Sequence, residues 1–343
     1  MRISRLDDIE KFKVEDERLF FSAQHEEIKM GLTTDIYFIK TLEVLKYLKR
    51  EDAYVKAEIF ARREGIFCGL PEVLNLLKDV DCNVYSLEEG ENFSAKEVVM
   101  RIEGRYVDFG IYETPILGIL ASSSAWATAA RRCKEAAGQK PILCFGARHI
   151  HPSVAPVMER AAKVGGADGV SCILAAKILG ISPSGTIPHA AILIAGSTEE
   201  VAIAYDKVIP EDSPCIILVD TFKDEAQEAL DVAKLLKEKL YGIRLDTPSE
   251  RGGVTPELVY EVRKRLDLEG FDHVKIFVSG GLDPEKIKIL SEAGADAFGV
   301  GSYISGAPPI DMTMDIKEVD GKPVAKRGRI PGVTVNTRLK RVK

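Results

Sequence analysis

The segment that most constrains the fold of this chain is residues 273–304, HVKIFVSGGLDPEKIKILSEAGADAFGVGSYI. Two short apolar runs, residues 274–278 and 297–300, each lead into glycines, and a helical segment lies between them. Asp283 followed by Pro284 is typical of the start of a helix, because aspartate caps free N–H groups and proline fits the first turn. The segment therefore predicts two consecutive parallel strands joined by a helix.

Both turns after these strands are rich in glycine: Ser279, Gly280 and Gly281 follow the first, and Gly299 and Gly301 close the second. Backbone N–H groups approach an anion closely where no Cβ intrudes. In (β/α)8 barrels the loops after the last two strands often hold a phosphate. The turns therefore predict a phosphate site, although tight turns without a ligand would also explain the glycines.

From residue 138 onward, short strands rich in Val, Ile, Leu and Cys alternate with helical segments, which is typical of a parallel sheet. The expected strands are residues 142–145, 169–173, 187–194, 216–219, 242–245, 274–278 and 297–300. A doubly wound sheet would carry its glycine fingerprint at the first turn, whereas here it comes last. We therefore predict an α/β fold with an irregular (β/α) barrel of seven or eight strands.

The first part of the chain has the pattern of a small α+β unit. Residues 54–60 alternate apolar and polar side chains, as a half-buried strand does, and further strands are expected at 82–87 and 98–102. Thr114, with Pro115 after it, is expected to cap the long helix that follows.

The barrel pattern stops after residue 308, and residues 312–326 have the pattern of a hairpin returning to the first unit. We therefore expect an α+β open-faced sandwich domain over residues 1–112 and 306–343, and the catalytic barrel over residues 113–305.

Composition narrows the classes of protein. The chain has 343 residues, of which 45% are hydrophobic and 29% charged, as in globular proteins, and its net charge of −6 gives no support to nucleic-acid binding. The six cysteines form no CxxC pair, which favours free thiols in a reducing compartment. Neither a signal core nor an apolar run of about 18 residues is present. We expect a cytoplasmic protein that binds neither nucleic acid nor membrane.

In a barrel, chemistry lies at the carboxyl ends of the strands. Charged or polar residues follow nearly every expected strand, namely Arg148, His149, Ser171, His189, Asp220, Arg244 and Asp246. Any single one would be explained by an ion pair or a cap, but unrelated structural needs would not place charge at almost every strand end. The sequence therefore predicts that these groups converge on one site.

The residue types at this site indicate the ligand. Asp220 and Asp246 are candidates to hold Mg²⁺, which takes carboxylates together with phosphate oxygens. Arg148 and Arg244 are suited to bind a carboxylate or a phosphate through their planar guanidinium groups. No GxxxxGK[ST] loop is present. These features predict a substrate with several anionic groups, and a barrel oxidoreductase or isomerase with the same phosphate site is an alternative.

Six motifs follow one another in the order seen in nicotinate phosphoribosyltransferases: TTDIY (33–37), FGARH (145–149), GTIPH (185–189), VDT (219–221), IRLD (243–246) and VSGG…VGS (278–302). The chain resembles this family over nearly its whole length, within the type II phosphoribosyltransferases that also include the nicotinamide and quinolinate enzymes. The resemblance implies a barrel beside an open-faced sandwich. It also implies transfer of phosphoribose from PRPP to nicotinate, giving nicotinate mononucleotide and pyrophosphate in NAD biosynthesis.

The resemblance also implies roles for individual residues. The glycines at 280, 281, 299 and 301, with Ser279, would hold the 5′-phosphate of PRPP. Asp220 and Asp246 would face the ribose hydroxyls or the Mg²⁺–pyrophosphate. Arg148 and Arg244 would contact the pyridine ring and its carboxylate.

His189 matches the histidine that ATP phosphorylates in this family to drive the transfer, so the resemblance implies ATP as a co-substrate. A hydrogen-bonded histidine at a strand end is the alternative. Asp35 and Tyr37 would reach the active site of a neighbouring subunit, which implies at least a homodimer with shared sites. Asp168 lies near the position where nicotinamide-using relatives bind the carboxamide, although it would also suit a cap of the preceding turn. His149 stands where many relatives have a second arginine.

Quinolinate is the closest alternative substrate, because the quinolinate enzyme shares the glycine turns and the barrel. That enzyme releases CO₂ and needs no ATP, and the second carboxylate of quinolinate requires a more basic pocket than this sequence offers.

Overall fold

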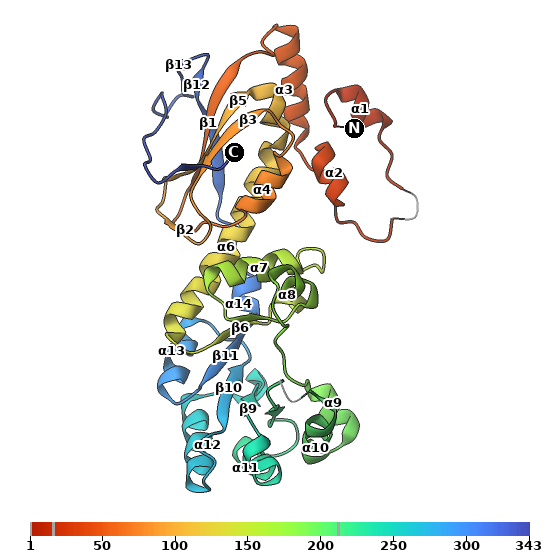
Figure 1. Cartoon of the computed structure of the whole chain (residues 1–343), viewed down its shortest axis with the longest axis vertical. Coiled ribbons are helices and arrows are strands. Elements are labelled where there is room, and N and C mark those ends of the chain that lie inside the picture. The colour runs from red at the N-terminus through yellow and green to blue at the C-terminus, as the bar shows by residue number, and fades with distance from the viewer. Residues whose placement is uncertain (1, 16–17, 211–212) are drawn as a thin grey trace. The chain divides into compact units, whose positions relative to one another are not determined.

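The computed structural model describes residues 2–15, 18–210 and 213–343. It divides the chain into two compact units, one of Met1–Ala127 with Pro308–Lys343 and the other of Thr128–Ala307 (Figure 1). Among the described residues, no helix combines the length and the apolar character needed to cross a membrane.

The first unit is built on a six-stranded antiparallel sheet with the order β13-β12-β1-β5-β3-β14. Its strands are β1 (Tyr54–Ala61), β3 (Cys82–Ser86), β5 (Val98–Arg105), β12 (Met312–Val319), β13 (Lys322–Pro323) and β14 (Lys340–Arg341). The expected hairpin is confirmed, because β12 pairs with β1 from Val55 opposite Val319 to Ala61 opposite Met312. The strands predicted at 54–60, 82–87 and 98–102 are also present.

The helices of this unit are α1 (Leu6–Lys11), α2 (His25–Met30), α3 (Ile36–Tyr47), α4 (Leu70–Leu76) and α5 (Tyr106–Phe109). A short strand pair, β2 (Gly65–Ile66) with β4 (Asn92–Phe93), completes it. The core contains fully buried side chains from the two central strands, among them Ile59, Met100 and Ile102.

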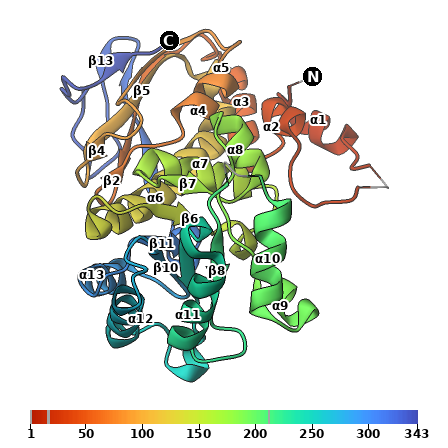
Figure 2. The same cartoon turned by 60° about the horizontal axis from the view of Figure 1, so that its bottom comes forward.

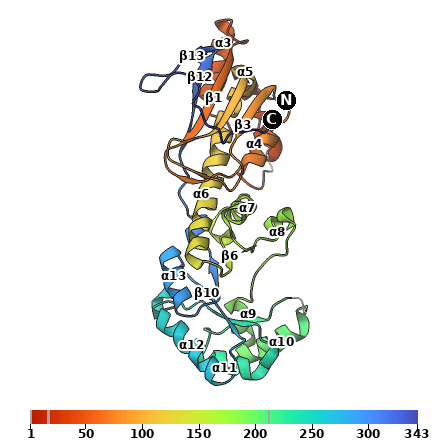
Figure 3. The same cartoon turned by 60° about the vertical axis from the view of Figure 1, so that its left-hand side comes forward.

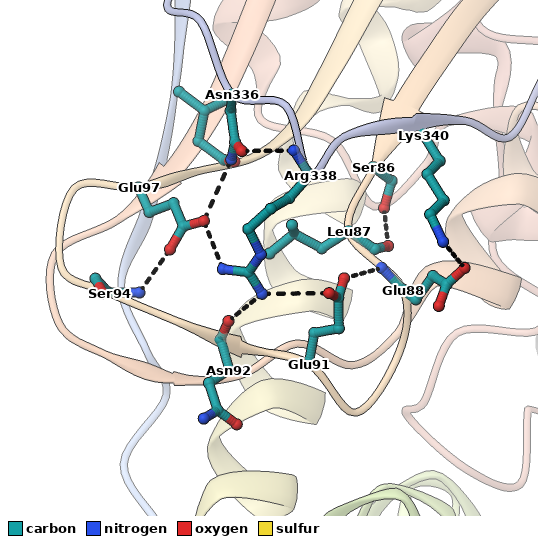
Figure 4. Close-up of polar contacts among 11 residues, drawn as sticks. Ser86, Leu87, Glu88, Glu91, Asn92, Ser94, Glu97, Asn336, Arg338 and Lys340 are labelled. Atoms are coloured by element: carbon teal, nitrogen blue, oxygen red, sulfur yellow. Dashed lines mark hydrogen bonds and ion pairs between the residues drawn. The ribbon is translucent and has the colours of Figure 1, made fainter.

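The C-terminal segment is held against this sheet by side chains on either side of β4 (Figure 4). Arg338 donates from Nη1 to Glu97 at 2.7 Å and from Nη2 to the carbonyl of Asn92 at 2.7 Å. Asn336 donates to the carbonyl of Val98 at 2.9 Å, and Lys340 forms an ion pair of 2.6 Å with Glu88. These contacts fasten the end of the chain to the segment between β3 and β5, next to the pairing of the edge strand β14 with β3.

The second unit contains a parallel sheet of six described strands with the order β7-β6-β11-β10-β9-β8. They are β6 (Ile142–Cys144), β7 (Gly169–Val170), β8 (Ile216–Leu218), β9 (Gly242–Leu245), β10 (Lys275–Ser279) and β11 (Ala297–Val300). Helices α11 (Glu225–Leu236), α12 (Pro256–Leu268) and α13 (Pro284–Glu292) follow one another around the outside of the sheet (Figure 2). The alternation of strands and helices predicted from residue 138 onward is therefore present.

The strand predicted at residues 187–194 is wrong. His189–Ala195 forms helix α9, with Pro188 before its first turn and Gly196 in the left-handed conformation after its last. Only Ile192 of its apolar residues is fully buried, whereas Leu193 and Ile194 are exposed. The apolar run packs on one side only, which a short helix allows and a buried parallel strand does not.

The described part of the connection from β7 to β8 therefore holds three helices: α8 (Ile173–Leu179), α9, and α10 (Thr198–Val208). An extended segment, residues 180–188, joins α8 to α9 (Figure 3). β7 and β8 form the edges of the sheet in the part of the chain that is described, so its hydrogen bonding is that of an open parallel sheet.

The long helix α6 (Glu113–Ala137) contains the division between the two units, between residues 127 and 128. We expected the division at residue 113. It lies later because the first half of α6 belongs with the first unit: the carbonyl of Ala121 accepts the N–H of Ile310 at 3.0 Å. Thr114 does not cap this helix, since its hydroxyl donates to Asp35 Oδ2 at 2.8 Å.

Candidate active site

A cavity of about 520 Å³ opens at the carboxyl ends of the parallel strands. It is lined by Phe145, Ala147, Arg148, His149, Ser171, Gly185, Thr186, Pro188, His189, Leu218, Arg244, Asp246, Ser279, Gly280, Gly281, Gly299, Gly301 and Ser302. Residues from the loops after β6, β7, β9, β10 and β11 meet here because all these strands are parallel and end at the same edge. The structure thus brings together most of the residues predicted from the strand ends.

Arg244, on β9, is fixed by three side chains. Its guanidinium donates to Ser279 Oγ at 2.8 Å, to Thr186 Oγ1 at 2.8 Å and to Asp246 Oδ2 at 3.0 Å. Its charge also lies 5.6 Å from the centre of the Phe145 ring. Because Asp246 neutralises it, Arg244 is a rigid part of the cavity wall rather than a free cation.

Asp246 has both carboxylate oxygens occupied, since Ser279 Oγ donates to its Oδ1 at 2.8 Å while Arg244 holds its Oδ2. Its backbone N–H donates to Asp220 Oδ2 at 3.1 Å. This bond joins the loop after β8 to the loop after β9.

Asp220 lies beneath the cavity wall, and its side chain is 1% exposed. Its Oδ1 atom is buried and, within the described part of the chain, has no hydrogen-bond partner. Burial raises the pKa of Asp220 to about 6; His189 opposes the rise, and the Asp246 carboxylate adds to it. A buried carboxylate with a bare oxygen carries an uncompensated cost that a bound cation or hydroxyl group would remove.

His189 is the first residue of α9, and its two ring nitrogens meet different partners. Nδ1 lies 3.0 Å from Thr221 Oγ1. Nε2 lies 3.8 Å from Asp220 Oδ1 and 4.0 Å from Asp246 Oδ2. Thr221 therefore orients the ring while the second nitrogen faces two carboxylates.

The two glycine turns differ in why they need glycine. Gly280 and Gly281 have φ values of +95° and +59°, which side chains with a Cβ rarely adopt. At Gly299 an added Cβ would lie 2.5 Å from the Phe145 ring, and at Gly301 it would lie 2.6 Å from His149 Cε1. The second turn needs glycine because residues 145 and 149 pack closely against it. Its glycines also leave the backbone open to the cavity.

Arg148 and His149 belong to a short 3-10 turn, Ala147–His149, after β6. Arg148 donates from Nε to His149 Nε2 at 3.3 Å. Among the described residues, no carboxylate forms an ion pair with Arg148, in contrast to Arg244. Burial, followed by the charge of Arg148, lowers the pKa of His149. Of the two arginines that line the described cavity, Arg148 is therefore the one that is free to meet an anionic ligand.

Asp168 lies elsewhere. Its Oδ2 accepts the backbone N–H of Ile142 at 2.8 Å and pairs with Lys134 at 2.9 Å. Ile142 is the first residue of β6, so this carboxylate caps the amino end of the sheet, opposite to the cavity. The contact with substrate predicted for Asp168 is not supported, and the alternative role as a local cap describes it better.

Asp35 and Tyr37 belong to the first unit. The Asp35 N–H donates to Thr114 Oγ1 at 3.2 Å, and the Tyr37 ring, 55% exposed, lies 4.3 Å from the Phe38 ring centre to centre. Their predicted place in a neighbouring subunit's active site stays a prediction.

The carboxylates at this site match only part of what a Mg²⁺ site needs. Within the described part of the chain, no group of three or more His, Cys, Asp or Glu side chains is arranged to hold a metal ion. Of the two predicted ligands, only Asp220 has an uncommitted carboxylate oxygen. Mg²⁺ commonly binds through one or two carboxylates with substrate phosphates and water. Asp220 alone suits that mode.

Sequence reasoning missed Thr186 and Phe145 as partners of Arg244, although both stand inside motifs that it singled out. It also missed Glu159, a fully buried acid on α7 (Ala155–Gly165) that bonds to Ser171. A single glutamate within a helical segment carries no sequence pattern that marks it as part of a site.

Comparison with known proteins agrees with this architecture. The model of the quinolinate phosphoribosyl transferase N-terminal domain matches residues 35–124, and that of the C-terminal domain matches residues 126–315. A nicotinate phosphoribosyltransferase of Mycobacterium tuberculosis is 33% identical over 248 residues, covering 70% of this chain and 54% of the relative. One from Bacillus subtilis is 34% identical over 228 residues, covering 64% and 45%. The chain thus spans about half the length of these curated relatives.

Among solved structures, nicotinate-nucleotide pyrophosphorylase from Pyrococcus furiosus is 47% identical with a TM-score of 0.89, and the match covers 92% of this chain and 82% of that one. Human nicotinic acid phosphoribosyltransferase shares the fold, with a TM-score of 0.73 at 19% identity, covering 88% and 77%. Both family models match in chain order, and together they span most of the sequence. The chain therefore belongs to the phosphoribosyltransferase family that these quinolinate phosphoribosyl transferase domains define.

Proposed function

We propose that this protein is a nicotinate phosphoribosyltransferase, which transfers phosphoribose from PRPP to the ring nitrogen of nicotinate and releases pyrophosphate in NAD biosynthesis. The observation that carries the proposal is that Arg148, a cation with no acidic partner among the described residues, lines the same cavity as two glycine turns. One anionic group would meet the arginine and another the turns. The names of the relatives from Mycobacterium tuberculosis and Bacillus subtilis support nicotinate.

In the proposed reaction the protein acts mainly by positioning the two substrates, and it forms no covalent bond to the sugar. A C–N bond forms at an anomeric carbon through an oxocarbenium-like state, so the protein holds the two reactants and neutralises the leaving group. The backbone of Gly280, Gly281 and Gly301 would hold the 5′-phosphate. Asp220 would lie near the sugar, where its negative charge would stabilise the positive charge that develops there.

Asp220, through its unpartnered Oδ1, would hold Mg²⁺, which would supply positive charge to balance the pyrophosphate. Asp246 would act mainly by holding Arg244 and Ser279 in place, because its two oxygens already accept hydrogen bonds from them.

We further propose that His189 accepts a phosphoryl group from ATP. Its Nε2 faces the cavity side of Asp220 and Asp246, and the contact of the opposite nitrogen with Thr221 Oγ1 holds the ring in this orientation. In such a step the Nε2–P bond forms as the bond to ADP breaks. ATP hydrolysis by the resting enzyme would be its signature.

Asp35 and Tyr37 are proposed to contribute to the active site of a neighbouring copy, which makes the working enzyme a homodimer or larger. The exposure of the Tyr37 ring supports this role, because an aromatic side chain left in water is available to a partner.

Quinolinate is the second candidate, since the matching family models carry its name. It has two carboxylates, whereas the cavity offers one arginine without an acidic partner among the described residues. His149 adds little charge, because burial and Arg148 lower its pKa. Nicotinate, with a single carboxylate, matches this charge better.

The deciding experiment is a product assay on the purified full chain. Nicotinate, nicotinamide and quinolinate are each incubated with PRPP and Mg²⁺, with and without ATP, and the mononucleotide and CO₂ are measured. Product from nicotinate, increased by ATP, is expected. Product from quinolinate with release of CO₂, and none from nicotinate, would overturn the proposal.

A further inference from the structure

Glu225, the first residue of α11, is a buried carboxylate that binds the loop after β9. The residue is 2% exposed. Its Oε1 accepts the Thr247 hydroxyl at 3.0 Å, and its Oε2 accepts Nη2 of Arg251 at 3.2 Å. Burying a carboxylate costs free energy unless hydrogen bonds or charges compensate it, and these two donors supply both. One buried side chain thus holds the loop after β9 at two points.

The loop that Glu225 holds begins at the cavity. It runs over residues 246–253, and Thr247 directly follows Asp246. Its far end forms a turn, because the N–H groups of Arg251 and Gly253 both donate to the carbonyl of Pro248 at 3.0 Å. The bond from the Thr247 side chain therefore acts on the backbone next to Asp246, and the bond from Arg251 holds the turn that follows.

The loops after β8 and β9 are also joined at the cavity itself. The N–H of Asp246 donates to Asp220 Oδ2 at 3.1 Å. Asp220 lies at the start of the loop after β8, and Glu225 lies at its end, where α11 begins. The two loops are thus connected at Asp246 and again at Thr247 and Arg251, and all of these bonds involve residues 220 and 225 of the same loop.

The position of Asp246 matters because its carboxylate organises the cavity wall. It accepts a bond from Arg244 at 3.0 Å and one from Ser279 at 2.8 Å. Hydrogen bonds of this kind weaken steeply when the distance or the angle departs from these values. A loop that is free to shift would therefore loosen the Arg244–Asp246–Ser279 network.

We propose that Glu225 is a positioning residue for Asp246: by holding the loop after β9 against α11, it keeps the Asp246 carboxylate on Arg244 and Ser279 and thereby supports turnover. That this turnover is phosphoribosyl transfer to nicotinate rests on the proposed function. The anchoring of the loop does not depend on the reaction.

The first test replaces Glu225 by methionine, which has a similar length but offers no oxygen to Thr247 or Arg251. Loss of hydrogen bonds to a charged group is expected to lower kcat about tenfold. KM for nicotinate should change less than about threefold, because Arg148 lies in a different loop. Hydrogen exchange of the amides at 246–253 should become faster, and this readout needs no activity.

Glu225→Gln tests whether the anchoring bonds themselves are what matters. The amide oxygen can accept from Arg251, and the NH₂ group can donate to the Thr247 hydroxyl, so both contacts can be kept. This variant should retain kcat within about threefold of the natural chain.

A double-mutant cycle tests whether Glu225 acts through Asp246. In an Asp246→Asn background, Glu225→Met should lower kcat by less than a further factor of about two, because residues that act through one another are not additive. Effects that multiply in full would show that Glu225 acts independently of Asp246.

Glu58→Met is the matched control for loss of stability alone. Glu58, on β1, is 1% exposed and accepts bonds from Arg101 at 3.0 and 3.1 Å, so the same substitution also breaks a buried carboxylate–arginine pair. It should lower Tm while kcat and hydrogen exchange at 246–253 stay unchanged.

The proposal is overturned if folded Glu225→Met keeps the natural kcat or the natural exchange rates at 246–253, if Glu225→Gln loses as much kcat as Glu225→Met, if the cycle is additive, or if Glu58→Met lowers kcat equally. If Glu225→Met does not fold, Thr247→Val, which removes only the hydroxyl, decides by kcat and hydrogen exchange. If the natural chain makes no product from nicotinate, the proposed function fails, and hydrogen exchange still decides whether Glu225 anchors the loop.

Discussion

The carboxylate of Asp220 accepts a 3.1 Å hydrogen bond from the backbone N–H of Asp246, so the ends of neighbouring strands β8 and β9 are joined directly. The bond uses Oδ2 and leaves Oδ1 bare and turned toward His189, 3.8 Å from its Nε2. Two carboxylates and a histidine are thus held at short distances before any ligand arrives, at the expense of one unsatisfied buried atom. Such sites are expected to lower stability in return for function.

Replacing Asp220 by asparagine should therefore stabilise the fold above neutral pH. The folded-state pKa of about 6 lies above the ordinary value of 3.8, so ionising Asp220 in the folded chain costs free energy at pH 8. Asp220→Asn avoids that cost, and its Tm at pH 8 should exceed that of the natural chain by about 2–4 °C. The gain should shrink as the pH falls from 6 to 4, because the natural Asp220 then becomes neutral as well. Thermal melts across this range measure it; a constant difference would contradict the assignment.

Replacing Asp246 by asparagine should cut turnover while the chain stays folded. The amide keeps the size of the side chain but removes the charge that balances Arg244, which then becomes a free cation in the cavity wall. We expect kcat to fall about 100-fold or more, as for loss of a preorganised charged group, with Tm changing by only a few degrees. Steady-state kinetics with nicotinate and PRPP test this. Unchanged kcat would remove Asp246 from the site.

His189→Ala should abolish ATP hydrolysis and only reduce phosphoribosyl transfer. The substitution removes the nitrogen that faces Asp220 and Asp246, so no acceptor for a phosphoryl group remains there. Release of ADP without pyridine substrate is the measurement, and Thr221→Val, which removes the hydroxyl near Nδ1, should give partial loss. Normal ADP release by His189→Ala would refute the phospho-acceptor role.

Arg338→Ala should destabilise the first unit by about 1 kcal/mol. The guanidinium contacts Glu97, Glu91 and the carbonyl of Asn92 (Figure 4). Such a network of several partners stabilises a fold more than an isolated surface ion pair does. A double-mutant cycle with Glu97→Gln, followed by urea unfolding, separates the pair from the rest of the network. Catalytic constants should stay unchanged, since the contacts lie wholly within the first unit. An additive cycle would show that the Arg338–Glu97 pair contributes nothing.

Much of the fold was predictable because local signals agreed with one another. The runs at 242–245 and 297–300 are strands with the expected bounds, and Asp283 caps α13, which lies between β10 and β11, as its place before Pro284 predicted. Residues 187–194 were mispredicted because a short apolar run fits a strand and a helix equally well. In the structure, residues 189–195 of this region form a helix whose one buried residue is Ile192.

For the site, the sequence predicted only which residues stand at the carboxyl ends of the strands. Strand order and parallel direction put Arg148, His189, Arg244 and Asp246 around one cavity, as their positions in sequence indicated. Asp168 precedes a strand rather than following one, so the same rule assigns it to the opposite edge of the sheet, whereas its predicted contact with substrate came from the resemblance to relatives.

The sequence by itself determined which residues could form the chemistry, because strand periodicity, glycine turns and chain order are local properties that each segment carries with it. Only the tertiary structure decided how they act: that Asp246 neutralises Arg244, that Arg148 keeps no acidic partner among the described residues, and that Glu159 accepts hydrogen bonds from the loop after β7. Such pairings depend on distances of about 3 Å between residues far apart in the chain, and no local pattern encodes those distances.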